Sequence, residues 1–488
     1  MKKIIIALVI VAAAASAGFA QYRAMEKRDN MMIEGRPFFT DGSIYNNYDL
    51  LGSPLGIFDI DSSHVSVELG YRYLGLGGGN GHYLGGQTLR MGAPGRAFFE
   101  VFYGPDFLSN NSSANSAKLP LHRFGFTLAG RPVSGHFGTS ISAEGYIGTQ
   151  EWDGNGNKRA LMGLERLRLD MGSQAHDLVR ANFYLNFTAR LDSLYIPNGG
   201  RTDFAFQTNL PEFGGGIDFG GEGVPVRSNL SFSYVFSRFV YSGTVNQGSP
   251  PATNAYGNAN AIRNDSLRFV WLTRGEFPII EELMVRPGLM LGFSRNAGRE
   301  HGPDNDDNYP HKINAAIPGR DYGLNGFYFG IGTGIGAFKY ADLHVEYSLA
   351  AMSLKLGDVY RSQDSTFVNS RLLHHTAFGM SASIHEFLDL PFNITPRIAY
   401  FISGSAGIID AVHSSLDPLN AAPGRSKGYL YTPHAFLHGF ERTSGFTFGV
   451  DGQVFEEKLS TSFWMTFLSK STESKGGMEL GVSVGFSM

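Results

Sequence analysis

A strict alternation of apolar and polar side chains runs through most of this chain and limits how it can fold. It is clearest in the stretch GGMELGVSVGFSM, where every even position from Met478 to Met488 is apolar and every odd position from Gly477 to Ser487 is glycine, serine or glutamate. A period of two places successive side chains on opposite faces of a β-strand. The pattern therefore predicts strands with one apolar face, which must meet either a protein core or a membrane.

The same alternation recurs along the chain in segments of about 9–15 residues, longer than the five or six residues usual in soluble strands. Gly (63), Phe (39) and Tyr (22) are abundant, and helix-period patterns are scarce. The composition is that of an all-β protein. Sixteen segments follow the pattern: 63–74, 96–104, 121–130, 135–149, 159–172, 178–192, 228–241, 265–277, 283–295, 325–338, 341–352, 370–386, 390–403, 443–455, 458–468 and 477–488.

Strands of this length suit a membrane. A strand needs about 9–11 residues to cross a tilted path through the bilayer, and a sheet in lipid must close so that every backbone group is paired. Soluble β-sandwiches and propellers also use many alternating strands, but their strands are shorter and carry more outward charge. We therefore expect a transmembrane, antiparallel, up-and-down β-barrel of about 16 strands, within a range of 14–18.

The spacing of the segments supports the barrel and bears on the strand number. From residue 228 onward short and long connections alternate, as they do in outer-membrane barrels. Before residue 228 the rhythm breaks at 75–95 and 193–227. A weak extra strand near 82–91 and another near 201–209 would restore it and raise the count to 18.

The first residues indicate export. Residues 1–20 combine Lys2 and Lys3, an apolar run, and small residues at Gly18 and Ala20, which is the pattern of a signal peptide cleaved before Gln21. A permanent anchor is the alternative, but about 15 apolar residues are short for a spanning helix. The expected organisation is a signal peptide at 1–20, an N-terminal segment at 21–62, and a barrel at 63–488.

Composition excludes several classes of protein. The net charge is −4 with no long basic run, so nucleic acid is not an expected partner. No apolar stretch near 18 residues follows residue 20, which argues against a transmembrane helix in the exported chain. The chain has no cysteine, so neither disulfides nor a cysteine-linked lipid can stabilise or anchor it.

The alternating strands, aromatic-rich faces and signal peptide resemble Gram-negative outer-membrane β-barrel proteins. The resemblance implies outer-membrane lipid as surroundings and the barrel-assembly machinery as a partner. That machinery usually reads a terminal aromatic residue, whereas this chain ends in Met488, with Phe486 two positions earlier on the same face.

A second, fainter resemblance is to the long-chain fatty-acid transporter family, in which a turn before the first strand plugs the lumen. The stretch YDLLGSPLGIFDI, 48–60, looks similar. Residues 21–62 lack alternation yet contain large apolar side chains, so we expect this segment to fold inside the barrel or across its mouth. The candidate plug residues are Leu50, Leu51, Pro54, Leu55, Ile57 and Phe58.

Motifs for catalysis or cofactors are weak. GIGTGIGA (330–337) formally matches a dinucleotide fingerprint, but its glycines alternate with isoleucine and threonine as in a strand. DNDDN (304–308) begins like a calcium loop, but Tyr309 replaces the required glycine and Ala315 the bidentate glutamate. There is no G-x-S-x-G esterase motif. We expect no enzyme activity, no cofactor and no metal site.

The polar parity should line the interior of the barrel. It could form a packed wall of paired charges or a wet passage for small solutes. Arginine placed at Thr447 should then cost much less stability than arginine at Phe448 on the lipid face. The expected function is a channel or transporter for small solutes, including hydrophobic ones if the plug is real. The alternative is a non-transporting barrel that acts as an adhesin, scaffold or secretion-system partner. The candidate lining residues are Arg72, Arg96, Arg123, Arg131, Arg190, Arg268, Arg274, Arg286, Arg397, Glu68, Glu100 and Asp451.

Overall fold

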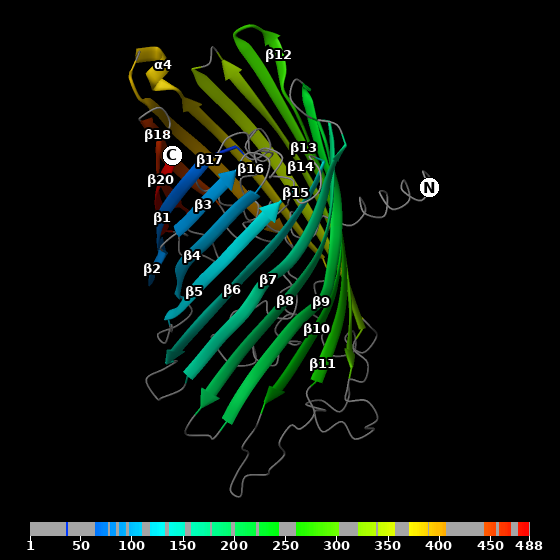
Figure 1. Ribbon diagram of the computed structural model, residues 1–488. Helices are drawn as coiled ribbons and strands as arrows, with labels where there is room; N and C mark the ends of the chain where they lie inside the picture. Colours follow the sequence, from blue (N-terminus) through cyan, green and yellow to red (C-terminus); the bar gives the residue numbers. More distant parts are fainter. Residues whose placement is uncertain are drawn as a thin grey trace, which may run out of the picture.

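The protein folds as one antiparallel sheet of long strands (Figure 1). The computed structural model describes residues 36–37, 64–76, 79–83, 87–93, 97–109, 118–131, 136–151, 158–175, 178–196, 201–220, 224–243, 260–301, 321–337, 340–356, 370–388, 390–406, 444–454, 458–469 and 477–487. These residues form 20 β-strands and one short helix: β1 (His64–Leu76), β2 (Gly79–Tyr83), β3 (Gln87–Ala93), β4 (Ala97–Ser109), β5 (Lys118–Gly130), β6 (Phe137–Glu151), β7 (Lys158–Ala175), β8 (Val179–Ile196), β9 (Arg201–Phe219), β10 (Val226–Gly243), β11 (Asn260–Gly275), β12 (Phe277–Ile280), β13 (Leu283–His301), β14 (Asp321–Ala337), β15 (Ala341–Leu356), β16 (Ser370–Ala382), α4 (Ile384–Leu388), β17 (Asn393–Ala406), β18 (Ser444–Val454), β19 (Leu459–Leu468) and β20 (Gly477–Ser487).

The sheet closes on itself. Most strands pair with the strands before and after them in the chain, and β1 pairs antiparallel with β20 along Ser66–Leu76 and Gly477–Ser487. Figure 1 shows these first and last strands side by side. Closure satisfies the backbone hydrogen bonds that an open sheet edge would leave exposed. The all-β, antiparallel barrel expected from the alternation is therefore confirmed.

The described strands fill 18 strand positions around the barrel. β2 pairs with the end of β1 and β3 pairs with its beginning, so the two together count as one strand of the barrel. β11 and β12 likewise both pair with β13. This leaves 18, the upper end of the expected range rather than its centre of 16. The two weak strands account for the difference: 82–91 overlaps β2 and β3, and 201–209 is the first half of β9.

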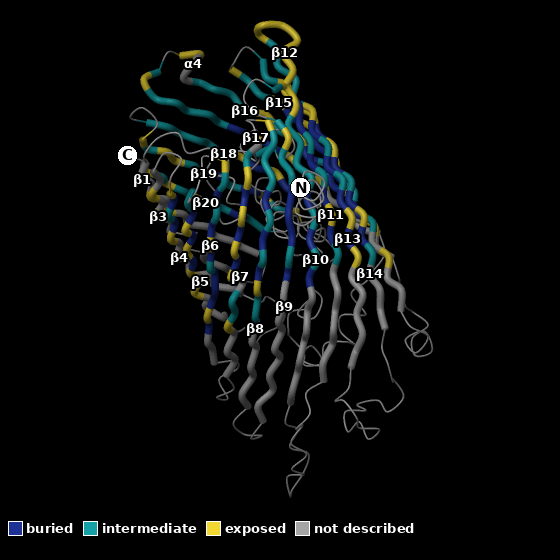
Figure 2. The backbone as a smooth tube through the Cα atoms, turned by 45° about the vertical axis from the view of Figure 1, so that its right-hand side comes forward, coloured by how far each residue is buried: buried dark blue, intermediate teal, exposed yellow. Residues whose placement is uncertain are grey.

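Burial follows the alternation (Figure 2). In β18, Phe446 and Phe448 are 46% and 40% exposed, whereas Thr447 between them is completely buried. Other strands repeat this order, with apolar side chains on the exposed outer face and polar ones on the buried inner face. An outer surface of exposed phenylalanine, leucine and isoleucine is stable only in lipid. A closed antiparallel barrel with an even number of strands is the outer-membrane architecture, so the protein is an outer-membrane β-barrel.

Large side chains on the inner face lie over glycines of the neighbouring strand. Trp464 is the register partner of Gly481, and Phe401 is the register partner of Gly445. A Cβ on Gly481 would come within 2.4 Å of the Trp464 ring. Glycine therefore makes room for inward aromatic rings, which gives the abundant glycines of the polar parity a packing role.

Connections alternate in length around the barrel. Four positions separate Ala175 from Val179, and far more separate Gly243 from Asn260 or Ala406 from Ser444. The end with short connections, called here the short-turn end, carries α4 and the β12–β13 turn at the top of Figure 1. Outer-membrane barrels keep their short turns on the periplasmic side. No helix in the described part of the chain is long and apolar enough to cross a bilayer.

Closure predicts a gel-mobility test. We expect the exported protein to require detergent for extraction and to migrate faster unboiled than boiled in SDS gels, because the hydrogen-bonded barrel stays compact until it is heated. A protein that dissolves without detergent, or whose mobility does not change on boiling, would contradict the barrel.

Candidate functional site

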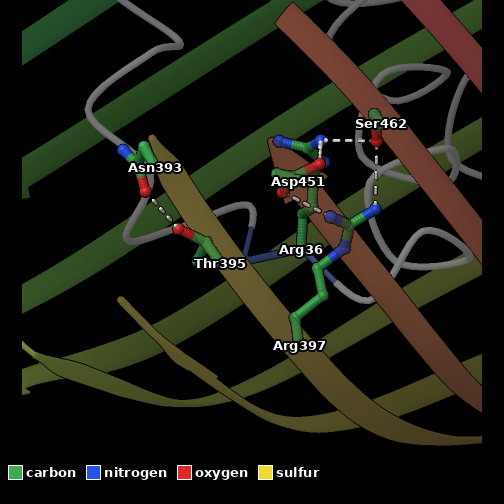
Figure 3. Close-up of polar contacts among 6 residues, drawn as sticks. All are labelled: Arg36, Asn393, Thr395, Arg397, Asp451 and Ser462. Atoms are coloured by element: carbon green, nitrogen blue, oxygen red, sulfur yellow. Dashed lines mark hydrogen bonds and ion pairs between the residues drawn. The ribbon is translucent and has the colours of Figure 1, made fainter. Parts of the chain in front are cut away.

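A polar cluster lies on the inner face at the short-turn end, where β17, β18 and β19 run side by side (Figure 3). Arg397 lies near the start of β17, Asp451 near the end of β18, and Ser462 near the start of β19. Asp451 pairs in register with Thr395 on one side and Ser462 on the other. The antiparallel register therefore gathers these side chains on one patch of the wall.

Arg36 reaches this patch from the N-terminal segment. Its Nη2 donates to Asp451 Oδ1 at 2.7 Å and to Ser462 Oγ at 3.1 Å. Arg397 forms an ion pair with the other carboxylate oxygen of Asp451 and donates to Ser462 Oγ at 3.4 Å. Two guanidinium groups thus share one carboxylate and one hydroxyl. In Figure 3 they approach Asp451 from opposite sides.

The two arginines differ in burial. The Arg397 side chain is 3% exposed, whereas that of Arg36 is 35% exposed and that of Asp451 is 28%. A buried guanidinium depends on its charge partner, because desolvation is costly without one. A partly exposed ion pair stabilises by only about 0–1 kcal/mol. Arg397 is therefore the arginine that depends most on Asp451, and Arg36 is the more exposed of its two partners.

Gly449 positions Arg397. The two residues are register partners, and a Cβ on Gly449 would lie 2.7 Å from Cζ and Nε of Arg397. The missing side chain lets the guanidinium lie flat across β18 and reach Asp451. Neighbouring amides complete the patch: Thr395 Oγ1 donates to Asn393 Oδ1 and Asn393 Nδ2 donates to Gln453 Oε1, each at 3.2 Å.

A second network lies farther into the wall, on β7, β8 and β9. Arg168 is 1% exposed; its Nε donates to Asp170 Oδ2 at 2.7 Å and its Nη2 to Oδ1 at 2.5 Å. Its guanidinium carbon lies 3.7 Å from the centre of the Tyr184 ring. Tyr184 and Asn186 donate to the buried Glu212 carboxylate at 3.2 and 2.9 Å. These contacts join three neighbouring strands on the inner face and rigidify the wall.

The predicted lining residues have different outcomes. Seven lie on the inner parity, and most of these are buried rather than open to water: Arg131, Arg268, Arg274, Arg286, Arg397, Glu100 and Asp451. Arg286 donates to Asp342 at 2.6 Å and forms a partly exposed pair. The side chains of Arg72, Arg123, Arg190 and Glu68, and all of Arg96, lie outside the described residues.

The signal peptide at 1–20, the turn at 48–60, and all six candidate plug residues also lie outside the described residues. These plug residues are Leu50, Leu51, Pro54, Leu55, Ile57 and Phe58. Only Arg36 and Pro37 represent the N-terminal segment. Among the described residues no group of three or more histidine, cysteine, aspartate or glutamate side chains could hold a metal ion.

Sequence reasoning missed Arg36 and Ser462 as functional candidates. Arg36 stands outside every alternating segment, and its partner Asp451 is 415 positions away. No local pattern joins residues so distant. Ser462 could have been found from its inner parity in 458–468, but a serine there has no charge to mark it.

Comparisons with known proteins give only remote likeness. No family model matches, and no curated protein matches. Among solved structures, the unliganded ferric citrate transporter FecA shares 9% identity over 88% of this chain and 79% of that chain, with a TM-score of 0.45. The ferric yersiniabactin uptake receptor FyuA from Yersinia pestis shares 10% over 88% and 80%, with a TM-score of 0.44. The siderophore receptor PiuA from Acinetobacter baumannii shares 8% over 88% and 82%, with a TM-score of 0.43. The likeness to fatty-acid transporters finds no support among these structures.

Proposed function

We propose that this protein is an outer-membrane transporter for a small solute and that its N-terminal segment, 21–62, closes the lumen. The observation that carries the proposal is the contact of Arg36 with Asp451 and Ser462 on the inner wall. A tether lying outside the barrel could not reach that patch. The segment would therefore enter the barrel at the short-turn end.

Burial of the inner face supports the same proposal. Tyr184, Tyr328 and Phe401 on this face are almost completely buried, as are Thr447 and Glu479. A wide water-filled channel would leave such side chains in contact with solvent. A barrel whose inner wall is covered by protein must open a path before it passes a solute. The outer-membrane lipid, the barrel-assembly machinery and a small solute are the proposed partners; neither nucleic acid nor a cofactor is required.

The closing segment can be tested by deletion. Removing residues 22–60 from the exported chain should leave a folded, heat-modifiable barrel but raise its conductance in planar bilayers several-fold. All the strand pairings in the described residues lie in the barrel wall, so folding should survive. A control is a shorter deletion within the long connection 407–443, which should not open the lumen from the short-turn end.

The outcome separates transport from the alternative role. Unchanged conductance after the deletion, or ready protease trimming of residues 21–62 in the native membrane, would contradict closure by this segment. A barrel that stays closed to sugars in liposome-swelling assays, with and without the segment, would instead favour a non-transporting adhesin, scaffold or secretion-system partner.

A further inference from the structure

We propose that Arg36 and the wall patch it occupies form a binding site for an oxyanion, a carboxylate or phosphate group carried by the solute. The inference rests on the proposed function, since the solute must reach the inner wall at the short-turn end. It adds the chemical class of the solute, which the proposed function leaves open.

The first step is the chemistry of the contact that Arg36 already makes. Its guanidinium donates to a carboxylate oxygen and a hydroxyl, at 2.7 and 3.1 Å. A guanidinium presents paired N–H groups that match the two oxygens of a carboxylate or phosphate. Asp451 therefore occupies the position that a solute oxyanion would take.

The second step is that Asp451 can release Arg36 without becoming an isolated charge. Its other oxygen is paired with Arg397, whose side chain is buried and held over Gly449. When an anion binds Arg36, the Asp451 carboxylate still has the Arg397 guanidinium, and the anion has that of Arg36. By contrast, the Arg286–Asp342 pair joins one arginine to one carboxylate. An anion that took Arg286 would remove the guanidinium that this contact gives to Asp342.

The third step is access. Arg36 is the most exposed of the three charged groups, with about a third of its side chain open. Partly exposed ion pairs are weak and exchange readily with competing ions. A bound anion would therefore compete with Asp451 for Arg36 and detach Arg36 from the wall.

The test uses the full-length protein refolded in detergent, with malonate and inorganic phosphate as probes. The chain has no cysteine, so Pro37→Cys gives a single site for a bimane label. Trp464 lies two residues beyond Ser462 on the same face of β19 and can quench a label held at the wall. Malonate should raise the bimane fluorescence saturably, and Trp464→Phe should remove the quenching.

Variants then assign the site. In the unlabelled protein, Arg36→Gln should weaken malonate binding in calorimetry at least about tenfold, since it removes a charge-assisted paired hydrogen bond. Arg36→Lys should bind less tightly than the native protein, because a single ammonium lacks the fork. Arg295→Gln removes an arginine from the exposed outer face and should leave malonate binding unchanged.

Several outcomes would overturn the inference. Equal fluorescence responses to malonate and to potassium chloride at matched ionic strength would indicate screening rather than binding. Native-like affinity in Arg36→Gln would place the anion elsewhere. If malonate binds as expected but deletion of 22–60 leaves conductance unchanged, only the closing role fails; if the deletion opens the barrel but malonate does not bind, only the anion site fails.

Discussion

Replacing Asp170 by alanine is expected to destabilise the barrel by about 3–5 kcal/mol, because the buried Arg168 guanidinium loses the carboxylate that accepts two of its hydrogen bonds. Arg168 is 1% exposed and makes two hydrogen bonds to the Asp170 carboxylate. The Tyr184 ring beneath it can offset only part of the lost interaction. Urea unfolding in lipid vesicles, followed by tryptophan fluorescence, measures the change in unfolding free energy.

Two controls separate burial from charge. Asp342→Ala breaks a pair of the same chemistry that is partly exposed at the short-turn end, and it should cost about 0–1 kcal/mol. The double change Arg168→Met with Asp170→Leu removes both buried charges and should recover most of the stability lost in Asp170→Ala. A cost below about 1 kcal/mol for Asp170→Ala would show that water reaches Arg168 in the membrane.

Arginine at Phe448 is the second large effect, with an expected cost of about 2–4 kcal/mol. Phe448 lies midway along β18 on the exposed outer face, so its replacement would bring a guanidinium into hydrocarbon. Vesicle unfolding again gives the free energy. Ser460→Arg is the matched control, because Ser460 is exposed on the inner parity near the short-turn end.

The control position suggested by sequence parity is wrong. The alternation assigns Thr447 to a polar face, where arginine should be tolerated. Thr447 is in fact completely buried, and its hydroxyl lies 2.9 Å from that of Thr466. A long side chain there would overpack the wall at a cost of about 1–3 kcal/mol. Equal costs at Phe448 on β18 and Ser460 on β19 would mean that both faces of the sheet are buried in protein, as in a soluble sandwich.

Most of the fold could be predicted from the sequence because it depends on a local period. The side chains of a strand alternate between its two faces. A strand with lipid on one face and a polar interior on the other therefore alternates between apolar and polar residues. The weak strands near 82–91 and 201–209 are harder to assign, since glycines interrupt the alternation in the first and polar residues make up most of the second. Their partners β1, β8 and β10 hold them in the sheet.

The candidate site could be predicted only in part. Parity placed Arg397 and Asp451 on one face, yet it says nothing about which inner residues meet or how deeply they are buried. Those properties depend on register between strands and on what fills the lumen. Gly449 is visible in the sequence, but the space it leaves for the Arg397 side chain exists only because the two residues are register partners.

By itself the sequence determined that this chain forms an outer-membrane barrel with an apolar outside and a polar inside, because both follow from a two-residue period. Only the tertiary structure decided the pairing of β1 with β20, the number of 18 barrel strands, and the burial of the inner wall. It alone brought Arg36 to Asp451 across 415 positions. The physical reason is that a barrel's closure and its interior contacts join residues distant along the chain, whose meeting no local pattern of side chains encodes.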